Sequence, residues 1–259
     1  MLAIEAVGLR KTYGAVEAVA GVDLAIGTGE IVGFLGPNGA GKTTTIKLLS
    51  GLLRPSAGRA AILGHDVQRE PIAAKALFGY VPDTPNLYGK LRGREFLRFM
   101  ARLYRVPPAE AEPRAAELLR LFDLADAAND LVEGYSHGMQ QKLALAGALV
   151  HDPRVLFLDE PTVGLDPRSA RLIKDILLRL RDRGATVFLS THILEIAERL
   201  CDRLVIIDKG RIIASGTMAE LRGQVAAGTD GERGAGSLED IFLRLTGGAE
   251  YAELAAVLR

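Results

Sequence analysis

The chain has 259 residues, and its 32 lysines and arginines balance 32 aspartates and glutamates, so the formal net charge is zero. This balance argues against nucleic acid as a partner, because proteins that bind a phosphate backbone normally carry a basic surplus. Cys201 is the only cysteine, which excludes an intrachain disulfide and fits a reducing compartment.

Two features of the hydropathy pattern bear on the membrane. The first eleven residues include Glu5 and lack the apolar core of a signal peptide. No uncharged apolar stretch approaches the roughly 20 residues needed to span a bilayer. We therefore expect a soluble chain whose role at a membrane depends on a separate partner.

Apolar periodicity predicts an α/β fold with a mainly parallel sheet. At the start, the segments 4–9 and 16–26 alternate apolar and polar residues and predict short strands that form an antiparallel flap. Later β-branched runs alternate with helical patterns, which is typical of a parallel sheet with helices on its faces. The runs are 31–35, 155–158, 186–190 and 204–208, and the helical patterns include 168–183 and 192–200.

The middle and the end of the chain depart from this alternation. Between residues 91 and 149 helical patterns dominate, at 94–104, 108–122 and 138–150, and predict a helical subdomain of about 86–150 inserted into a domain of 1–227. Residues 228–236 contain four glycines and predict a flexible linker. A capping-box-like start at Ser237 opens a short helical tail over 237–259.

A glycine-rich motif follows the strand predicted at 31–35. Residues 36–43 read Gly-Pro-Asn-Gly-Ala-Gly-Lys-Thr and match G-x-x-x-x-G-K-[ST], in which backbone N–H groups converge on phosphate. A helix beginning at Lys42 would direct the positive end of its dipole at the same anion. In this interpretation Lys42 reaches the β- and γ-phosphates, and the Thr43 hydroxyl ligates Mg²⁺. The predicted nucleotide-binding residues here are Gly36, Pro37, Asn38, Gly39, Ala40, Gly41, Lys42, Thr43 and Thr44.

A second motif stands at the end of the strand predicted at 155–158. Asp159 is placed to hold Mg²⁺ through its hydration shell, because the carboxyl ends of parallel strands lie beside the phosphate loop. Glu160 is a candidate general base for a water that attacks the γ-phosphate. Many strands end in acids, so this motif alone is weak evidence for a phosphate site. The glycine-rich loop is what makes the catalytic interpretation of Asp159 and Glu160 specific. Together the two motifs predict phosphoryl transfer to water.

With the segments 135–141 and 164–166 and with His192, these motifs resemble the ATP-binding subunit of ABC transporters over residues 3–217. The resemblance implies that ATP and Mg²⁺ are the cofactors and that hydrolysis powers a separate transmembrane permease, with the subunit on the cytoplasmic face of the cell membrane. It implies a head-to-tail dimer of two such subunits, most simply a homodimer, and poor hydrolysis by monomers. The wording of 160–167 and the tail resemble the branch that exports drugs, lipids or polysaccharides.

The resemblance also assigns roles residue by residue. Tyr13 would stack on adenine, although it could instead pack within the flap. Ser136 and Gly138 would contact the γ-phosphate bound to the opposite subunit, Asp166 would belong to a loop that crosses the dimer interface, and His192 would contact the γ-phosphate and orient water. At the signature segment Ser136-His137-Gly138-Met139-Gln140, His137 replaces a glycine of the family and Met139 its usual glutamine.

The departure with the clearest chemical consequence is Asp83, where the family usually has a glutamine that ligates Mg²⁺ and water. An aspartate could still bind the metal, but it adds negative charge beside the γ-phosphate. The alternative is that Asp83 only turns the loop after Pro82. The apolar segments 86–88 and 91–99 are candidates either for docking the permease or for the core of the helical subdomain.

Competing functions differ in features that the sequence can show. The alternative to a transporter subunit is a soluble ABC-type ATPase without a transport role, or another P-loop ATPase. A metabolic P-loop kinase would lack the signature-like segment and would phosphorylate a small acceptor. A DNA-repair ATPase of the superfamily would need sustained heptads between the two phosphate motifs, and the sequence has none.

Overall fold

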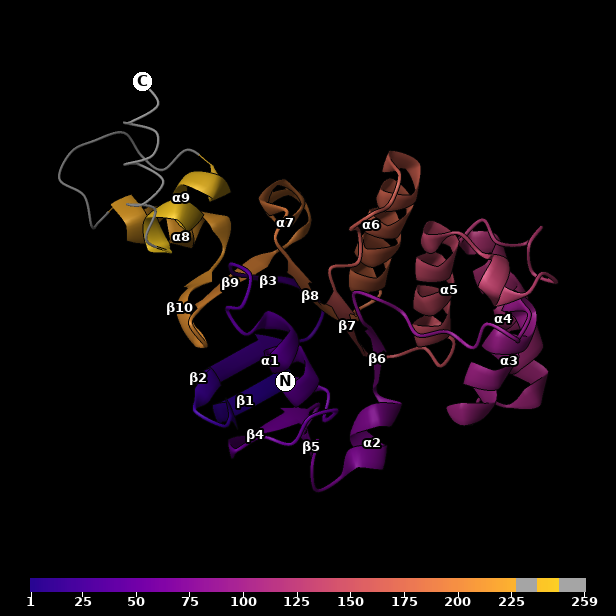
Figure 1. Ribbon diagram of the computed structural model, residues 1–259, viewed down its shortest axis with the longest axis horizontal. Helices are drawn as coiled ribbons and strands as arrows, with labels where there is room; N and C mark the ends of the chain where they lie inside the picture. The colour runs from indigo at the N-terminus through magenta and orange to yellow at the C-terminus, as the bar shows by residue number, and fades with distance from the viewer. Residues whose placement is uncertain (227–236, 247–259) are drawn as a thin grey trace.

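The computed structural model describes residues 1–226 and 237–246, and its centre is a six-stranded sheet (Figure 1). The strand order is β10-β9-β3-β8-β7-β6, and every neighbouring pair from β9 to β6 is parallel. Only β10 runs antiparallel, beside β9. The bounds are β3 (Ile31–Leu35), β6 (Phe78–Val81), β7 (Val155–Asp159), β8 (Thr186–Thr191), β9 (Arg203–Asp208) and β10 (Arg211–Gly216). The mainly parallel sheet expected from the sequence is therefore confirmed.

A second, antiparallel sheet forms the flap, in the order β2-β1-β4-β5. It consists of β1 (Leu2–Tyr13), β2 (Val16–Gly27), β4 (Ala57–Ile62) and β5 (His65–Asp66). The strand predicted at 16–26 is confirmed as β2, whereas the strand predicted at 4–9 was too short, since β1 has 12 residues. Register shifts interrupt their pairing at several points and break the apolar alternation, which is why the sequence pattern looked shorter.

The expected helical insertion lies between β6 and β7. Its main helices are α3 (Gly93–Leu103), α4 (Pro108–Leu121) and α5 (His137–Leu149), which stand together at the right of Figure 1, away from the flap. Buried side chains of these helices, such as Phe96, Leu119 and Leu145, share one apolar cluster with Leu156 and Leu158 of β7. One face of the central sheet thus supports the insertion.

The opposite face of the sheet carries α1 (Lys42–Leu49), which lies between the two sheets. Its buried Ile46 and Leu49 share a second apolar cluster with Phe34 of β3 and with Ile4 and Leu9 of β1. The flap therefore clamps α1 against the sheet. This packing fixes the start of α1, and with it the loop that precedes Lys42.

The remaining helices are α2 (Pro71–Ala76), α6 (Pro167–Asp182), α7 (Leu194–Leu200), α8 (Met218–Ala226) and α9 (Leu238–Leu245). Ser237 begins α9 with a capping box that includes Asp240. Leu238 and Ile241 are fully buried against a third cluster that contains Leu35. The linker predicted at 228–236, and the part of the predicted tail after residue 246, lie outside the described residues.

Candidate functional site

The glycine-rich loop connects the buried strand β3 to α1, and close packing explains two of its glycines. A Cβ at Gly36 would meet the carbonyl oxygen of Ile207 at 2.4 Å, and one at Gly41 would meet that of Ala18 at 2.5 Å. Gly41 has a φ of 104° and is the N-cap of α1, with no side chain satisfying the first N–H groups. The helix therefore presents free backbone donors and its positive dipole end to the space in front of the loop.

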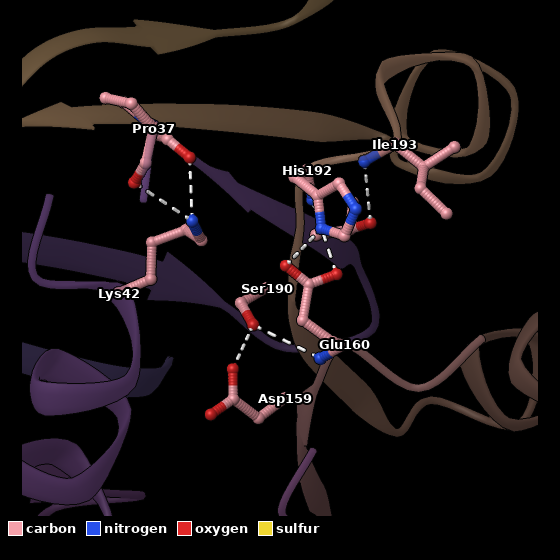
Figure 2. A network of polar contacts seen from close by, with 9 residues as sticks. Pro37, Lys42, Asp159, Glu160, Ser190, His192 and Ile193 are labelled. Carbon is pink, nitrogen blue, oxygen red and sulfur yellow. Dashed lines mark hydrogen bonds and ion pairs between the residues drawn. The ribbon is translucent and has the colours of Figure 1, made fainter. Parts of the chain in front are cut away.

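That space is a cavity of about 490 Å³. It brings together the loop, both acids at the end of β7, His192 after β8 and Asp83 after β6, which are far apart in the sequence. The lining consists of Ala18, Pro37, Asn38, Gly39, Gly41, Lys42, Thr43, Thr44, Asp83, Thr84, His137, Asp159, Glu160, Val163 and His192. Figure 2 shows how part of this group converges from neighbouring strands.

Lys42 lies folded back onto its own loop. Its Nζ donates to the carbonyl oxygens of Gly36 at 2.7 Å and Pro37 at 3.2 Å (Figure 2). Burial lowers the pKa of Lys42, and the nearby carboxylates of Glu160 and Asp159 oppose this shift. Within the described residues the ammonium donates to two carbonyl oxygens, so one of its three N–H donors remains for an anionic partner.

Asp159 is 1% exposed and has one satisfied oxygen. Its Oδ1 accepts a hydrogen bond from Ser190 Oγ, which stands directly opposite on β8. Its Oδ2 is buried and has no hydrogen-bond partner within the described part of the chain. A buried carboxylate oxygen without a partner is costly, so it calls for an explanation. A cation in the cavity would supply one.

Glu160 and His192 form a close pair across β7 and β8. His192 Nδ1 lies 2.9 Å from Glu160 Oε1, and the backbone N–H of His192 lies 3.4 Å from Oε2 (Figure 2). The backbone N–H of Glu160 donates to the Ser190 carbonyl oxygen at 3.1 Å. Glu160 also has a φ of 50°, a left-handed conformation that non-glycine residues rarely adopt. Strain of this kind is characteristic of functional sites.

Asp83 reaches the cavity but already has a local partner. Its Oδ1 accepts the backbone N–H of Thr84 at 2.8 Å, as the turn interpretation expects. The side chain remains exposed and faces the same cavity as Thr43 and Asp159. Both interpretations of Asp83 are therefore compatible with its position.

Six of the predicted binding residues lie outside the cavity lining. Gly36 and Ala40 are buried within the loop itself. Tyr13 is 51% exposed, and the Nζ of Lys11 lies 5.3 Å from the centroid of its ring. The other three are Ser136, Gly138 and Asp166.

Ser136 and Asp166 cap helices. Ser136 accepts the backbone N–H of Met139 at the start of α5. Asp166 accepts N–H groups of Arg168 and Ser169 at the start of α6, and the Ser169 hydroxyl and these N–H groups lower its pKa. Neither side chain therefore lines the cavity of its own chain.

The sequence patterns missed four residues beside the site. Ser190 holds Asp159, and Ala18, Val163 and Thr84 line the cavity. His137, noted only as a departure from the signature, lines the cavity as well, with Nε2 3.4 Å from the Val163 carbonyl oxygen. The pairing of Ser190 with Asp159 depends on the β7–β8 register, for which the sequence carried no signal.

Comparison with known proteins identifies the family. The ABC transporter family model matches residues 19–163, more than half of the chain. A daunorubicin resistance ATP-binding protein of Streptomyces coeruleorubidus is 44% identical over 245 residues, which cover 95% of this chain and 75% of the relative. The chain belongs to the ABC transporter family. It is an ATP-binding and ATP-hydrolysing subunit of that family, as the motifs predicted.

Further ABC proteins support this assignment. A fluoroquinolones export ATP-binding protein of Mycobacterium tuberculosis is 45% identical over 222 residues, which cover 86% of this chain and 72% of the relative. A solved ATP-binding subunit of an ABC transporter, 36% identical, superposes with a TM-score of 0.87 over 95% of this chain and 99% of its own. A dimeric post-hydrolysis ATP-binding cassette with bound ADP and phosphate, 26% identical, gives 0.77 over 83% and 98%.

Two kinds of feature are absent from the described residues. None of their helices combines the length and apolar character needed to cross a membrane. No three His, Cys, Asp or Glu side chains of this part of the ABC subunit are grouped so as to hold a metal ion on their own. A metal at this site would therefore depend on hydroxyl, phosphate and water oxygens besides the acids, which is the ligand set that Mg²⁺ commonly has in nucleotide sites.

Proposed function

We propose that the cavity binds ATP with Mg²⁺ and that Glu160 activates the water that attacks the γ-phosphate. The observation that carries this proposal is the meeting of three features at one cavity: free N–H donors at the start of α1, the unpaired buried oxygen of Asp159, and the Glu160–His192 pair. The free N–H groups and Lys42 would hold the phosphates. Lys42 would exchange its loop carbonyls for phosphate oxygens.

The residues present fit Mg²⁺. Thr43 and Asp159 offer the hard oxygen ligands that this ion prefers, and the unpaired Oδ2 of Asp159 would gain a partner. Asp83 is a third candidate ligand at the edge of the same cavity. When bound, the ion would neutralise charge on the phosphates.

Glu160 and His192 would have different roles in the hydrolysis step. Glu160 would accept the proton of the attacking water, since its carboxylate faces the cavity and is fixed on both oxygens by His192. The ring of His192 turns Nδ1 to Glu160, which leaves Nε2 for the γ-phosphate. His192 would thereby set the distance between the base and the phosphate.

We further propose that two copies assemble head to tail and that Ser136, Gly138 and Asp166 act on the partner's nucleotide. These residues lie at the N-terminal ends of α5 and α6, outside the lining of their own cavity. The dimeric relative with bound ADP and phosphate supports such an arrangement. Tyr13, half exposed on the flap, is a candidate for stacking on the adenine.

The transport partner would be a separate transmembrane permease, with this subunit on the cytoplasmic face of the cell membrane. An exposed apolar group on the helical insertion supports docking: Tyr88 contacts Phe99 ring to ring at 5.2 Å, and Leu103 is 62% exposed nearby on α3. Relatives named for daunorubicin resistance and fluoroquinolones export support export of drug-like compounds.

An ATPase and dimerisation experiment tests the composite site. Glu160→Gln removes the base but keeps the shape, so ATP hydrolysis without an added acceptor should be lost. The variant should elute as a dimer in gel filtration with Mg-ATP and as a monomer with EDTA. The matched control, Glu160→Gln with Ser136→Ala, should stay monomeric. Turnover that depends on a small acceptor, or a monomer under all conditions, would refute the proposal.

A further inference from the structure

A tyrosine beside the phosphate site has a buried hydroxyl without a partner. The O–H of Tyr80 on β6 makes no hydrogen bond within the described part of the chain, and neither does Oδ2 of Asp159 on β7. One atom is a donor and the other an acceptor. Buried polar atoms are normally paired, so two complementary unpaired atoms on adjacent strands need a common explanation.

The register of the sheet places both side chains on the same face. Tyr80 is directly opposite Phe157 in the parallel pair β6–β7. Asp159 follows Phe157 by two residues, so the two side chains of β7 point to the same side of the sheet. Tyr80 packs on the apolar cluster that contains Phe157 and Ile46 of α1. Tyr80 and Asp159 thus share the face that carries the phosphate-binding helix.

The electrostatic surroundings keep the phenol in its donor form. Burial raises the pKa of Tyr80, and the carboxylates of Asp159 and Asp83 raise it further. The hydroxyl therefore stays protonated at physiological pH. Its proton is available to an acceptor near these two acids.

We propose that Tyr80 is a positioning residue of the magnesium site, whose hydroxyl donates a hydrogen bond to the oxygen shell that Asp159 holds around the ion. The inference rests on the proposed role of Asp159 in binding Mg²⁺. When Mg²⁺ is bound, Oδ2 of Asp159 would have the ion's shell as its partner, and the Tyr80 hydroxyl would have an oxygen of that shell as its acceptor. Tyr80 would fix an oxygen of this shell, and through it the orientation of the Asp159 carboxylate, without itself touching the metal.

A magnesium titration of nucleotide binding tests this role without relying on turnover. Binding of the non-hydrolysable analogue AMP-PNP is measured by calorimetry at increasing Mg²⁺, with EDTA as the zero point. Tyr80→Phe should raise the Mg²⁺ concentration for half-maximal binding about three- to tenfold, the usual range for one lost hydrogen bond. Binding in EDTA should not change. Tyr104→Phe, which removes a hydroxyl after α3, is the matched control and should match wild type.

Thermal unfolding separates positioning from a structural role. Tyr80→Phe removes an unpaired buried hydroxyl, so the nucleotide-free variant should unfold at the same temperature as wild type or higher. A lower unfolding temperature with an unchanged magnesium midpoint would overturn the inference. So would an equal loss of binding in EDTA and in Mg²⁺.

Asp159→Asn distinguishes a failure of the Tyr80 inference from a failure of the proposed metal role of Asp159. If this variant shifts the magnesium midpoint and Tyr80→Phe does not, the inference on Tyr80 fails and the metal role of Asp159 stands. If neither shifts it, both fail together. Shifts in both variants, with Tyr104→Phe unchanged, support both.

Discussion

The imidazole Nδ1 of His192 lies 2.9 Å from the carboxylate of Glu160, and the two residues come from the ends of adjacent parallel strands. The backbone N–H of His192 approaches the second oxygen of the same carboxylate. The carboxylate is thus held from one side by a single residue. A movement of the loop after β8 that displaces His192 would release the carboxylate of the proposed base from both contacts.

The first prediction concerns this pair. His192→Ala should lower kcat for ATP hydrolysis by about 10²-fold or more, because the base loses its orienting partner and the phosphate loses a contact. Affinity for AMP-PNP should change less than threefold. Steady-state phosphate release and calorimetry give the two quantities. His65→Ala, at a surface ion pair with Glu70, is the control and should hydrolyse ATP as wild type does. A higher KM with an unchanged kcat would contradict the assignment.

The second prediction concerns Lys42. Its lowered pKa means that the unfolded chain binds this proton more tightly than the folded one, so the ammonium destabilises the fold at neutral pH and less so toward pH 10.5. Lys42→Met should therefore keep or raise the unfolding temperature of the nucleotide-free protein. Wild type should gain about 5–10 °C with Mg-ATP at 100-fold its Kd, and the variant nothing. A variant that is less stable without nucleotide would show that Lys42 is structural.

The third prediction is a pH dependence of stability that comes from His151. Its ring stacks on Tyr104 at 3.6 Å and its Nε2 lies 3.1 Å from the Phe78 carbonyl oxygen. Burial lowers the pKa of His151 to about 4, from 6.5. Between these values the unfolded chain takes up the proton and the folded one does not. Stability is therefore full above pH 6.5, falls as the pH drops toward 4, and is flat below it as far as His151 is concerned, with a total effect of at most about 3 kcal/mol.

Urea unfolding between pH 4 and 7.5 measures this contribution. His151→Gln keeps an amide donor for the Phe78 carbonyl but cannot take up a proton, so the difference from wild type should shrink as the pH falls. His65→Gln provides the matched control at an exposed site. Parallel curves for wild type and His151→Gln would rule out a neutral buried histidine.

The fourth prediction separates the two interpretations of Asp83. Asp83→Asn keeps the oxygen that accepts the Thr84 N–H but removes the charge. If Asp83 helps to bind the metal, the Mg²⁺ concentration for half-maximal ATPase activity should rise severalfold, and stability without nucleotide should stay within about 0.5 kcal/mol. Asp66→Asn, whose oxygen accepts the N–H groups of Gln68 and Arg69 outside the cavity, is the control. A magnesium curve equal to that of wild type would leave Asp83 a turn residue.

The phosphate loop and the acids after β7 could be predicted because each rests on local chemistry. A glycine-rich turn needs little beyond its own residues and flanks, and the apolar run 155–158 of β7 is recognisable as a buried strand. The strand β6 could not be found in this way, because Gly79 interrupts its short apolar run. Its Gly79 is required by packing, since a Cβ there would meet the Ala148 carbonyl oxygen at 2.5 Å. Such a contact is invisible until the fold is known.

The residues that were missed at the site depend on contacts between elements far apart in the sequence. Ser190 contacts Asp159 only because β7 and β8 pair in one particular register. His137 reaches the Val163 carbonyl only because α5 starts beside the loop after β7. Both are long-range relationships between elements. The local patterns of a single sequence do not reveal such contacts, although the sequence as a whole determines them.

The helix α9 has a consequence for how the protein is made. Leu238 and Ile241 are fully buried in the cluster that contains Leu35, the last residue of the strand before the phosphate loop. A ribosome synthesises Leu35 some two hundred residues before it synthesises Ile241. The apolar surface behind the phosphate loop therefore stays incompletely covered during most of translation. A nascent chain halted before α9 would expose that surface and be a target for chaperones rather than a working ATPase.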